Sequence, residues 1–199
     1  MSFLKKVIII CSTFIFMQNL LASEQIKVKT DFLKKINNVI LIVEDTTLNK
    51  EQRNTKIVDT LTPIFDFELM AKLSLGKTWK TLNIQNREKF IDLYIKRMKQ
   101  SYSSKIDAYK DEKVVITKIN QLKSNRIALV TNLINKKTAL EIEYKFYKPK
   151  KQKNKKNDWL IYDVVILGVS VIKTDKVQFK EYLQTHTITN LMDNLSKKL

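Results

Sequence analysis

The stretch IALVTNLINKKTALEIEYKF, residues 127–146, decides the fold class because its side chains alternate in character. In residues 127–133 and 140–146, apolar side chains occupy nearly every second position, and charged residues fill the gaps in the second run. A period of two is typical of β-strands that bury one face. The two runs with a short polar link between them therefore predict a pair of antiparallel strands.

Two further strands are predicted on either side of this pair. Residues 113–122 alternate less regularly, whereas residues 159–167 (WLIYDVVIL) are apolar on both faces apart from Asp163. A strand of the second kind belongs in the middle of a sheet with both faces covered. The lysine-rich segment 148–158 between the last two strands is predicted to be a solvated hairpin loop. The four strands together predict an antiparallel meander.

The sequence outside these strands has the three-to-four-residue period of α-helices. We predict helices over residues 31–45, 51–61, 65–73, 86–109 and 175–199. Asp66 is expected to cap the third helix, and the threonines at 185, 187 and 189 predict a break in the last. One face of the fourth helix carries Phe90, Tyr94, Met98 and Tyr102. The fold class expected is α+β, with helices packed on a sheet of four or more strands.

Residues 1–23 have the features of a signal peptide. Lys5 and Lys6 precede an eleven-residue apolar run, VIIICSTFIFM at 7–17, which is too short to span a bilayer comfortably. Cleavage after Ala22 or Ser23 fits this pattern, and an uncleaved N-terminal anchor is the alternative. We therefore predict a signal peptide over 1–23 and one exported domain over 24–199, whose net charge is +15 instead of +17 after loss of the two lysines.

The composition excludes several classes of protein. One Cys, one His and two Gly cannot form a Cys/His zinc site or a glycine-rich phosphate loop. Only four of the 37 basic residues are arginines, which nucleic-acid readers favour, so no nucleic-acid partner is expected. The charge indicates a solvated lysine surface, with attraction to anionic membranes as the alternative. His186 lies in no motif, and Asp163 is expected to have a structural partner. We expect no enzyme, no metal and no cofactor.

Two separated motifs are similar to those of one known protein family. The first comprises PIFDF at 63–67, MA at 70–71, LGK at 75–77 and Trp79, and is similar to the family pattern P-x-FDF-x-x-MA…LG-x-x-W. The second comprises WLIYDV at 159–164, GVS at 168–170 and QF at 178–179, and is similar to W-x-IYDV…EGVSLV…YR-x-QF. The chain departs from the pattern at Leu167, Val171 and residues 175–176, around one corner of the predicted fold.

The two motifs in this order resemble the MlaC, or toluene-tolerance, family, and this resemblance implies a periplasmic phospholipid-binding protein. Members carry lipid between an outer-membrane lipoprotein complex and an inner-membrane ABC transporter complex, which maintains outer-membrane lipid asymmetry. The implied fold is a cone of helices on a curved antiparallel sheet, similar to nuclear transport factor 2, with an apolar cavity for acyl chains. We expect a monomer with phospholipid as its cargo. The expected lining residues are Phe65, Phe67, Met70, Leu73, Trp79, Tyr94, Tyr144, Phe146, Trp159, Ile161, Val164, Val169 and Val171.

Two other interpretations stay open at this point. The chain could be a basic periplasmic adaptor with a filled core that binds anionic membranes or acidic proteins through residues 148–156. It could also be a small enzyme of the same α+β class, for which Asp163 is the only candidate acid or base. Composition alone does not distinguish a filled core from a lipid cavity.

Overall fold

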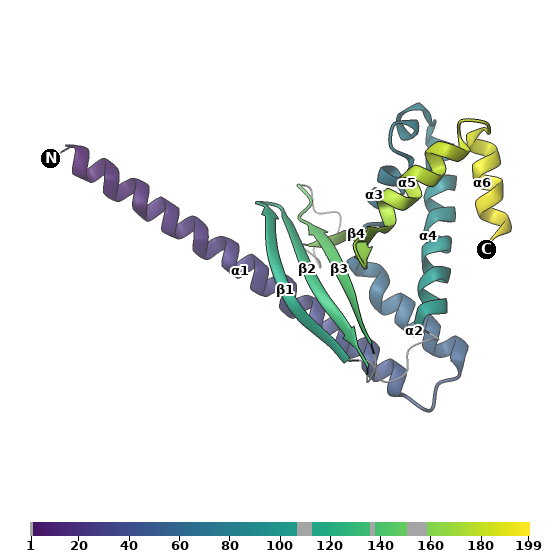
Figure 1. Cartoon of the computed structure of the whole chain (residues 1–199), viewed down its shortest axis with the longest axis horizontal. Helices are drawn as coiled ribbons and strands as arrows, with labels where there is room; N and C mark the ends of the chain where they lie inside the picture. The colour runs from purple at the N-terminus through teal and green to yellow at the C-terminus, as the bar shows by residue number, and fades with distance from the viewer. Residues whose placement is uncertain (1, 107–112, 136–137, 151–158) are drawn as a thin grey trace.

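The computed structural model describes residues 2–106, 113–135, 138–150 and 159–199 (Figure 1). The predicted loop 148–158 lies outside the described residues from 151 onward. In chain order the elements are α1 (Ser2–Glu44), α2 (Lys50–Leu61), the 3-10 helix η1 (Thr62–Ile64), α3 (Phe67–Leu75), the 3-10 helix η2 (Thr78–Thr81), α4 (Ile84–Ile106), β1 (Lys113–Lys123), β2 (Arg126–Ile134), β3 (Ala139–Tyr147), β4 (Leu160–Ile166), β5 (Val169–Ser170), α5 (Val171–Tyr182) and α6 (Ile188–Lys197). Helices pack on an antiparallel sheet, which confirms the α+β class.

The sheet has the strand order β1-β2-β3-β4-β5, and every neighbouring pair is antiparallel. The predicted four-stranded meander is confirmed, and the two-residue β5 extends it. As predicted, β4 lies inside the sheet and not at its edge, although only the two-residue β5 lies beyond it. β4 is partnered on both edges. Phe65 forms a parallel bridge with Ile161, and the Asp66 amide donates to the Ile161 carbonyl at 2.9 Å.

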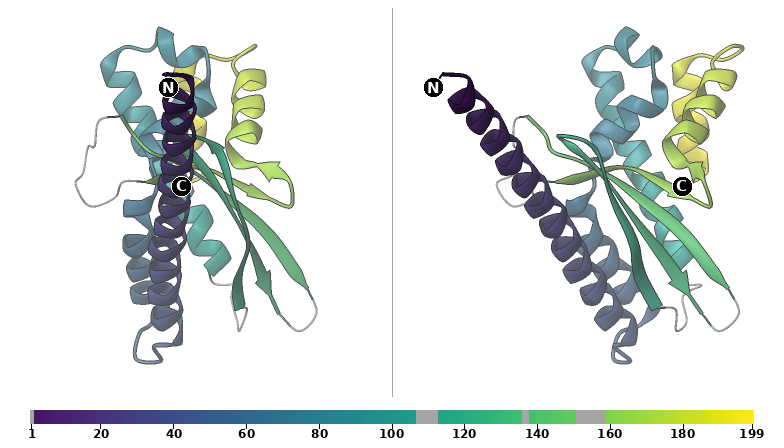
Figure 2. Two further views of the ribbon diagram at one scale, coloured as in Figure 1. Left: turned by 90° about the vertical axis from the view of Figure 1, so that its left-hand side faces the viewer. Right: turned by 60° about the vertical axis from the view of Figure 1, so that its left-hand side comes forward.

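One face of the sheet is covered by α1. Phe32 on this helix is 3% exposed, and its ring centroid lies 4.7 Å from that of Tyr144 and 6.1 Å from that of Phe146. The helix runs diagonally past the strands and its N-terminal half projects beyond them (Figures 1 and 2). It starts well before residue 31, where we predicted its beginning, because residues 23–30 contain no glycine or proline to end a helix.

The remaining helices form a second layer around α4. As predicted, Phe90, Tyr94 and Met98 lie on one buried face of α4. α3 packs against both α4 and α5, and α6 packs against α4 (Figure 2). The predicted break near Thr187 is confirmed, since α5 ends at Tyr182 and Thr187 caps α6 by accepting a hydrogen bond from the Asn190 amide. Within the described part of the chain, no helix has the length and apolar character needed to cross a membrane.

Candidate functional site

Two apolar clusters meet inside the molecule at Phe65 and Val171. The helical cluster is built from α3, η2, α4, α5 and α6, and the sheet cluster from α1, η1 and one face of β2, β3 and β4. Phe65 and Val171 are partly buried and pack against both clusters. The Phe65 ring also stacks on Phe67, with centroids 5.2 Å apart. We call the zone where the two clusters meet the seam.

Asp66 fixes the backbone at this seam. As predicted, it caps α3, because its carboxylate accepts a hydrogen bond from the Leu69 amide at 2.9 Å. The Tyr147 hydroxyl donates to the other carboxylate oxygen. Burial and the neighbouring Asp66 both raise the pKa of Tyr147, so the hydroxyl stays a donor. The segment from Phe65 to Phe67 is thus fixed by hydrogen bonds of both the backbone amide and the side-chain carboxylate of Asp66.

Most of the predicted lining residues belong to these two clusters. Phe67, Met70, Trp79 and Tyr94 lie in the helical cluster, and Phe146, Trp159, Ile161 and Val164 lie in the sheet cluster, with Tyr144 packed against it. Leu73 and Val169 lie outside both, with exposed fractions of 36% and 60%. The predicted lining residues therefore converge on one interior, apart from these two.

The sheet side of the interior retains apolar surface that the protein itself leaves partly uncovered. Ile116, Ile119, Ile142 and Ile166 point to the same sheet face as Tyr144 and pack against the sheet cluster, yet each is only half-buried. Ile36 on α1 and Leu61 on α2 share this property. None of these six was predicted as lining, although the alternation of β3 places Ile142 on the face of Tyr144.

The polar side chains on this face, Tyr144 and Thr131, are neutral and form hydrogen bonds. Burial raises the pKa of Tyr144 to about 12, and a hydrogen bond with the Thr131 side chain opposes this only in part. Thr131 is itself buried and donates to the Ile142 carbonyl at 3.2 Å. The face is therefore an uncharged wall suited to apolar ligands.

Asp163 has the structural partners that the sequence predicted. Its carboxylate accepts hydrogen bonds from the Ser170 hydroxyl at 2.8 Å and from the Ile172 amide at 3.2 Å, and Lys145 Nζ lies 3.6 Å away. Ser170 in turn caps α5 by accepting a hydrogen bond from the Lys173 amide. Asp163 therefore joins β4 to the start of α5.

A second buried carboxylate, Asp175, ties α5 to α4 and was not predicted. It is 2% exposed and accepts hydrogen bonds from Arg97 at 2.7 Å and from the Tyr94 hydroxyl at 2.8 Å. Burial alone would lower the pKa of Arg97, but the hydrogen bond and charge of Asp175 outweigh it and raise that pKa. These hydrogen bonds fix α5 against α4 at one side of the helical cluster.

The single histidine of the sequence, His186, is exposed, and its ring stacks on that of Tyr182 with centroids 4.2 Å apart. No group of three or more His, Cys, Asp or Glu side chains in the described ranges is arranged to hold a metal ion.

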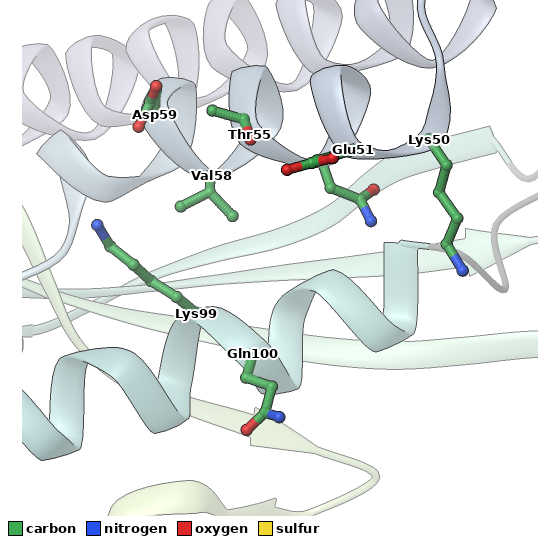
Figure 3. A pocket seen from close by; sticks show the side chains of 8 residues that line it. Lys50, Glu51, Thr55, Val58, Asp59, Lys99 and Gln100 are labelled. Carbon is green, nitrogen blue, oxygen red and sulfur yellow. The ribbon is translucent and has the colours of Figure 1, made fainter. Parts of the chain in front are cut away.

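A pocket of about 670 Å³ lies between α2 and α4 (Figure 3). Its walls include Lys50, Glu51, Val58 and Asp59 from α2 and Lys99 from α4. Sequence reasoning missed this pocket, because on each helix alone these residues resemble an ordinary solvated face.

Known proteins are similar to this chain in sequence and in fold. Residues 33–197 match the family model described as MlaC protein. The intermembrane phospholipid transport system binding protein MlaC of Haemophilus influenzae is 28% identical over 120 residues. That match covers 60% of this chain and 55% of the relative, or little more than half its length.

A solved structure has the same fold. The phospholipid-binding protein from Ralstonia solanacearum, described as a complex with a phospholipid, superposes with a TM-score of 0.72 at 19% identity. The match covers 87% of this chain and 94% of that one.

Proposed function

Because the chain belongs to the MlaC family, we propose that it is a phospholipid carrier, and not an enzyme, that holds the acyl chains of its cargo in the apolar interior. The carrier works between an outer-membrane lipoprotein complex and an inner-membrane ABC transporter complex in the periplasm, and so maintains lipid asymmetry. It does so as a monomer. The names of the Haemophilus and Ralstonia proteins support the cargo assignment.

One observation carries this proposal: the half-buried isoleucines on the inner face of the sheet. Ile116, Ile142 and Ile166 pack against the sheet cluster and keep exposed area there, whereas side chains at the centre of a core are covered completely. An acyl chain lying along this face would cover that area. The lining that we propose consists of the predicted residues in or against the clusters together with these isoleucines.

The energetics fit a carrier. Two acyl chains contain about 30 methylenes, each worth about 0.8 kcal/mol when it leaves water, so the total exceeds ~20 kcal/mol. A protein interior of comparable apolarity offsets most of this, and lipid can pass between membrane and carrier at small net cost. The transfer makes and breaks no covalent bond, and so needs no catalytic group.

Export to the periplasm rests on the proposed signal peptide. Glu24 is the first residue of the proposed domain 24–199, and it already contacts the sheet layer. Its carboxylate accepts hydrogen bonds from Lys148 Nζ at 2.8 Å and from Trp159 Nε1 at 2.6 Å. Removal of residues 1–23 would therefore leave these contacts in place.

The test is lipid content and lipid transfer. Protein purified without detergent is extracted and its phospholipids identified by mass spectrometry, and transfer of a fluorescent phospholipid between vesicles is then followed. Ile142→Glu places a charge on the proposed lining and should lower uptake at least tenfold, a difference of about 1.4 kcal/mol or more. The control Val115→Glu places the same charge on the exposed opposite face of the sheet and should change nothing. Circular dichroism establishes that both variants are folded.

Salt separates this proposal from the basic adaptor. Attraction between surface lysines and anionic headgroups falls as ionic strength rises, whereas lipid held by its tails is retained. Protein that carries no phospholipid, and takes up none from vesicles at low or high salt, would refute the carrier function.

A further inference from the structure

The apolar inner face of the sheet reaches the surface of the molecule at the turn between β4 and β5. Ile142, Ile166 and Val169 are cross-strand partners in one row, and directly opposite residues share a face of an antiparallel sheet. Exposure rises along this row, because Ile142 and Ile166 are half-buried whereas Val169 is 60% exposed. Leu167, in the turn, is 66% exposed. We call Leu167 and Val169 the tip, and Figure 2 shows the turn before α5 at the periphery, away from the N-terminal half of α1.

The turn at the tip is unfavourable for a leucine. Leu167 and Gly168 have φ values of 49° and 80°, as do the two central residues of a type I′ turn. Glycine adopts this left-handed region freely and asparagine tolerates it, whereas a leucine is strained there. The family pattern has Glu at the position of Leu167. A large apolar side chain that is both strained and exposed points to a contact outside the folded chain.

The outward face of α5 places positive charge beside the tip. α5 buries Ile172 and Phe179 in the helical cluster, and its opposite face carries four exposed residues at helical spacing: Lys173, Lys176, Val177 and Lys180. Exposed Glu141, whose carbonyl accepts a hydrogen bond from the Leu167 amide, and exposed Glu181 oppose this charge only in part. The net charge of +17 also draws the whole chain to anionic surfaces. An apolar tip beside a lysine-rich helix face suits the boundary of an anionic bilayer.

Resting on the proposed carrier function, we propose that the tip and the outward face of α5 touch an anionic bilayer while cargo is loaded or released. Leu167 and Val169 enter the apolar boundary of the bilayer, and the lysines of α5 contact lipid phosphates. Ile166 precedes the tip directly, and Val171, two residues beyond it, packs at the seam. The contact therefore brings the edge of the proposed lining to the membrane, so that an acyl chain crosses little water during transfer.

Binding to vesicles tests this contact, and one substitution separates it from folding. Leu167→Asn removes the apolar side chain but keeps the turn, because asparagine followed by glycine is the favoured type I′ sequence. Its urea midpoint should equal or exceed that of wild type. Its binding to vesicles with equal amounts of phosphatidylethanolamine and phosphatidylglycerol, measured by co-sedimentation at low salt, should weaken about tenfold. Lys180→Gln should weaken binding up to about fivefold, and this difference should vanish at high salt.

The matched control is Ile84→Asn. Ile84 is the first residue of α4 and is 68% exposed, but it belongs to neither the tip nor α5. This control should leave vesicle binding unchanged, and equal losses in Ile84→Asn and Leu167→Asn would refute the contact.

The remaining outcomes separate the bilayer contact from the carrier function. If Leu167→Asn binds vesicles as wild type does, or if wild type binds no vesicles of lipid alone, the contact is refuted. Phospholipid in the purified protein would then still uphold the carrier function. If wild type binds vesicles through the tip but neither holds nor takes up phospholipid, the carrier function fails, and with it the role of the contact in loading.

Discussion

Replacing Phe32 with alanine should destabilise the protein by removing the main contact between α1 and the sheet. Phe32 is only 3% exposed, and its ring contacts those of Tyr144 and Phe146. Burying such a side chain contributes about 1.5–3 kcal/mol, and the cavity left by truncation raises the cost of Phe→Ala to about 3–5 kcal/mol. The free energy of unfolding of such domains is about 5–15 kcal/mol, so the variant should still fold.

Urea denaturation measures this cost. With a slope of about 2 kcal/mol per molar urea, the midpoint of Phe32→Ala should fall by about 2 M with the slope unchanged. Leu41→Ala is the matched control, because Leu41 lies on the same helix and is 65% exposed. Its cost should stay within about 0.5 kcal/mol. Equal midpoints for the two variants would show that α1 does not pack on the sheet as described.

Three other substitutions, one of them with a control, test the buried carboxylates and the start of the proposed domain. Asp175→Asn breaks the pair with Arg97 and should cost about 3–5 kcal/mol in urea unfolding, whereas Asp193→Asn, in an exposed pair, should cost less than about 1 kcal/mol. Asp163→Asn should cost about 1–3 kcal/mol and leave lipid transfer per folded molecule unchanged, and a loss of transfer at full stability would contradict its structural role. Burial raises the pKa of Glu24, but its hydrogen bonds and nearby lysines outweigh this and lower it. Its stabilisation is thus present at neutral pH and lost as pH falls below about 4, so Glu24→Gln should flatten the acid limb of stability against pH.

Local signals in the sequence were enough to predict most elements and their ends. The alternation of residues 127–146 predicted β2 and β3, and the threonines around Thr187 predicted the break before α6. Asp66 was identified as a cap because that role depends only on the residues that follow it. These features are short-range, and tertiary packing did not override them.

Features that depend on long-range contacts escaped prediction. Asp175 meets Arg97 from 78 residues away, and nothing around either residue indicates the pair. The second partner of β4 near Ile161 is the bridge to Phe65, which joins segments that a local pattern cannot connect. The charged pocket likewise exists only because α2 packs beside α4.

The same reasoning separates what the motifs mark from what a carrier needs. Residues such as Phe67, Met70 and Ile161 are almost completely buried by protein, so they shape the interior and have little area left for a ligand. The half-buried side chains, such as Ile142 and Phe65, have that area. A fully covered wall would make the empty protein more stable but would leave lipid nothing to bury, whereas exposed apolar area costs about 25 cal/mol per Å² until a ligand covers it. Uptake by the proposed carrier should therefore depend on the partly exposed residues, and stability on the buried ones.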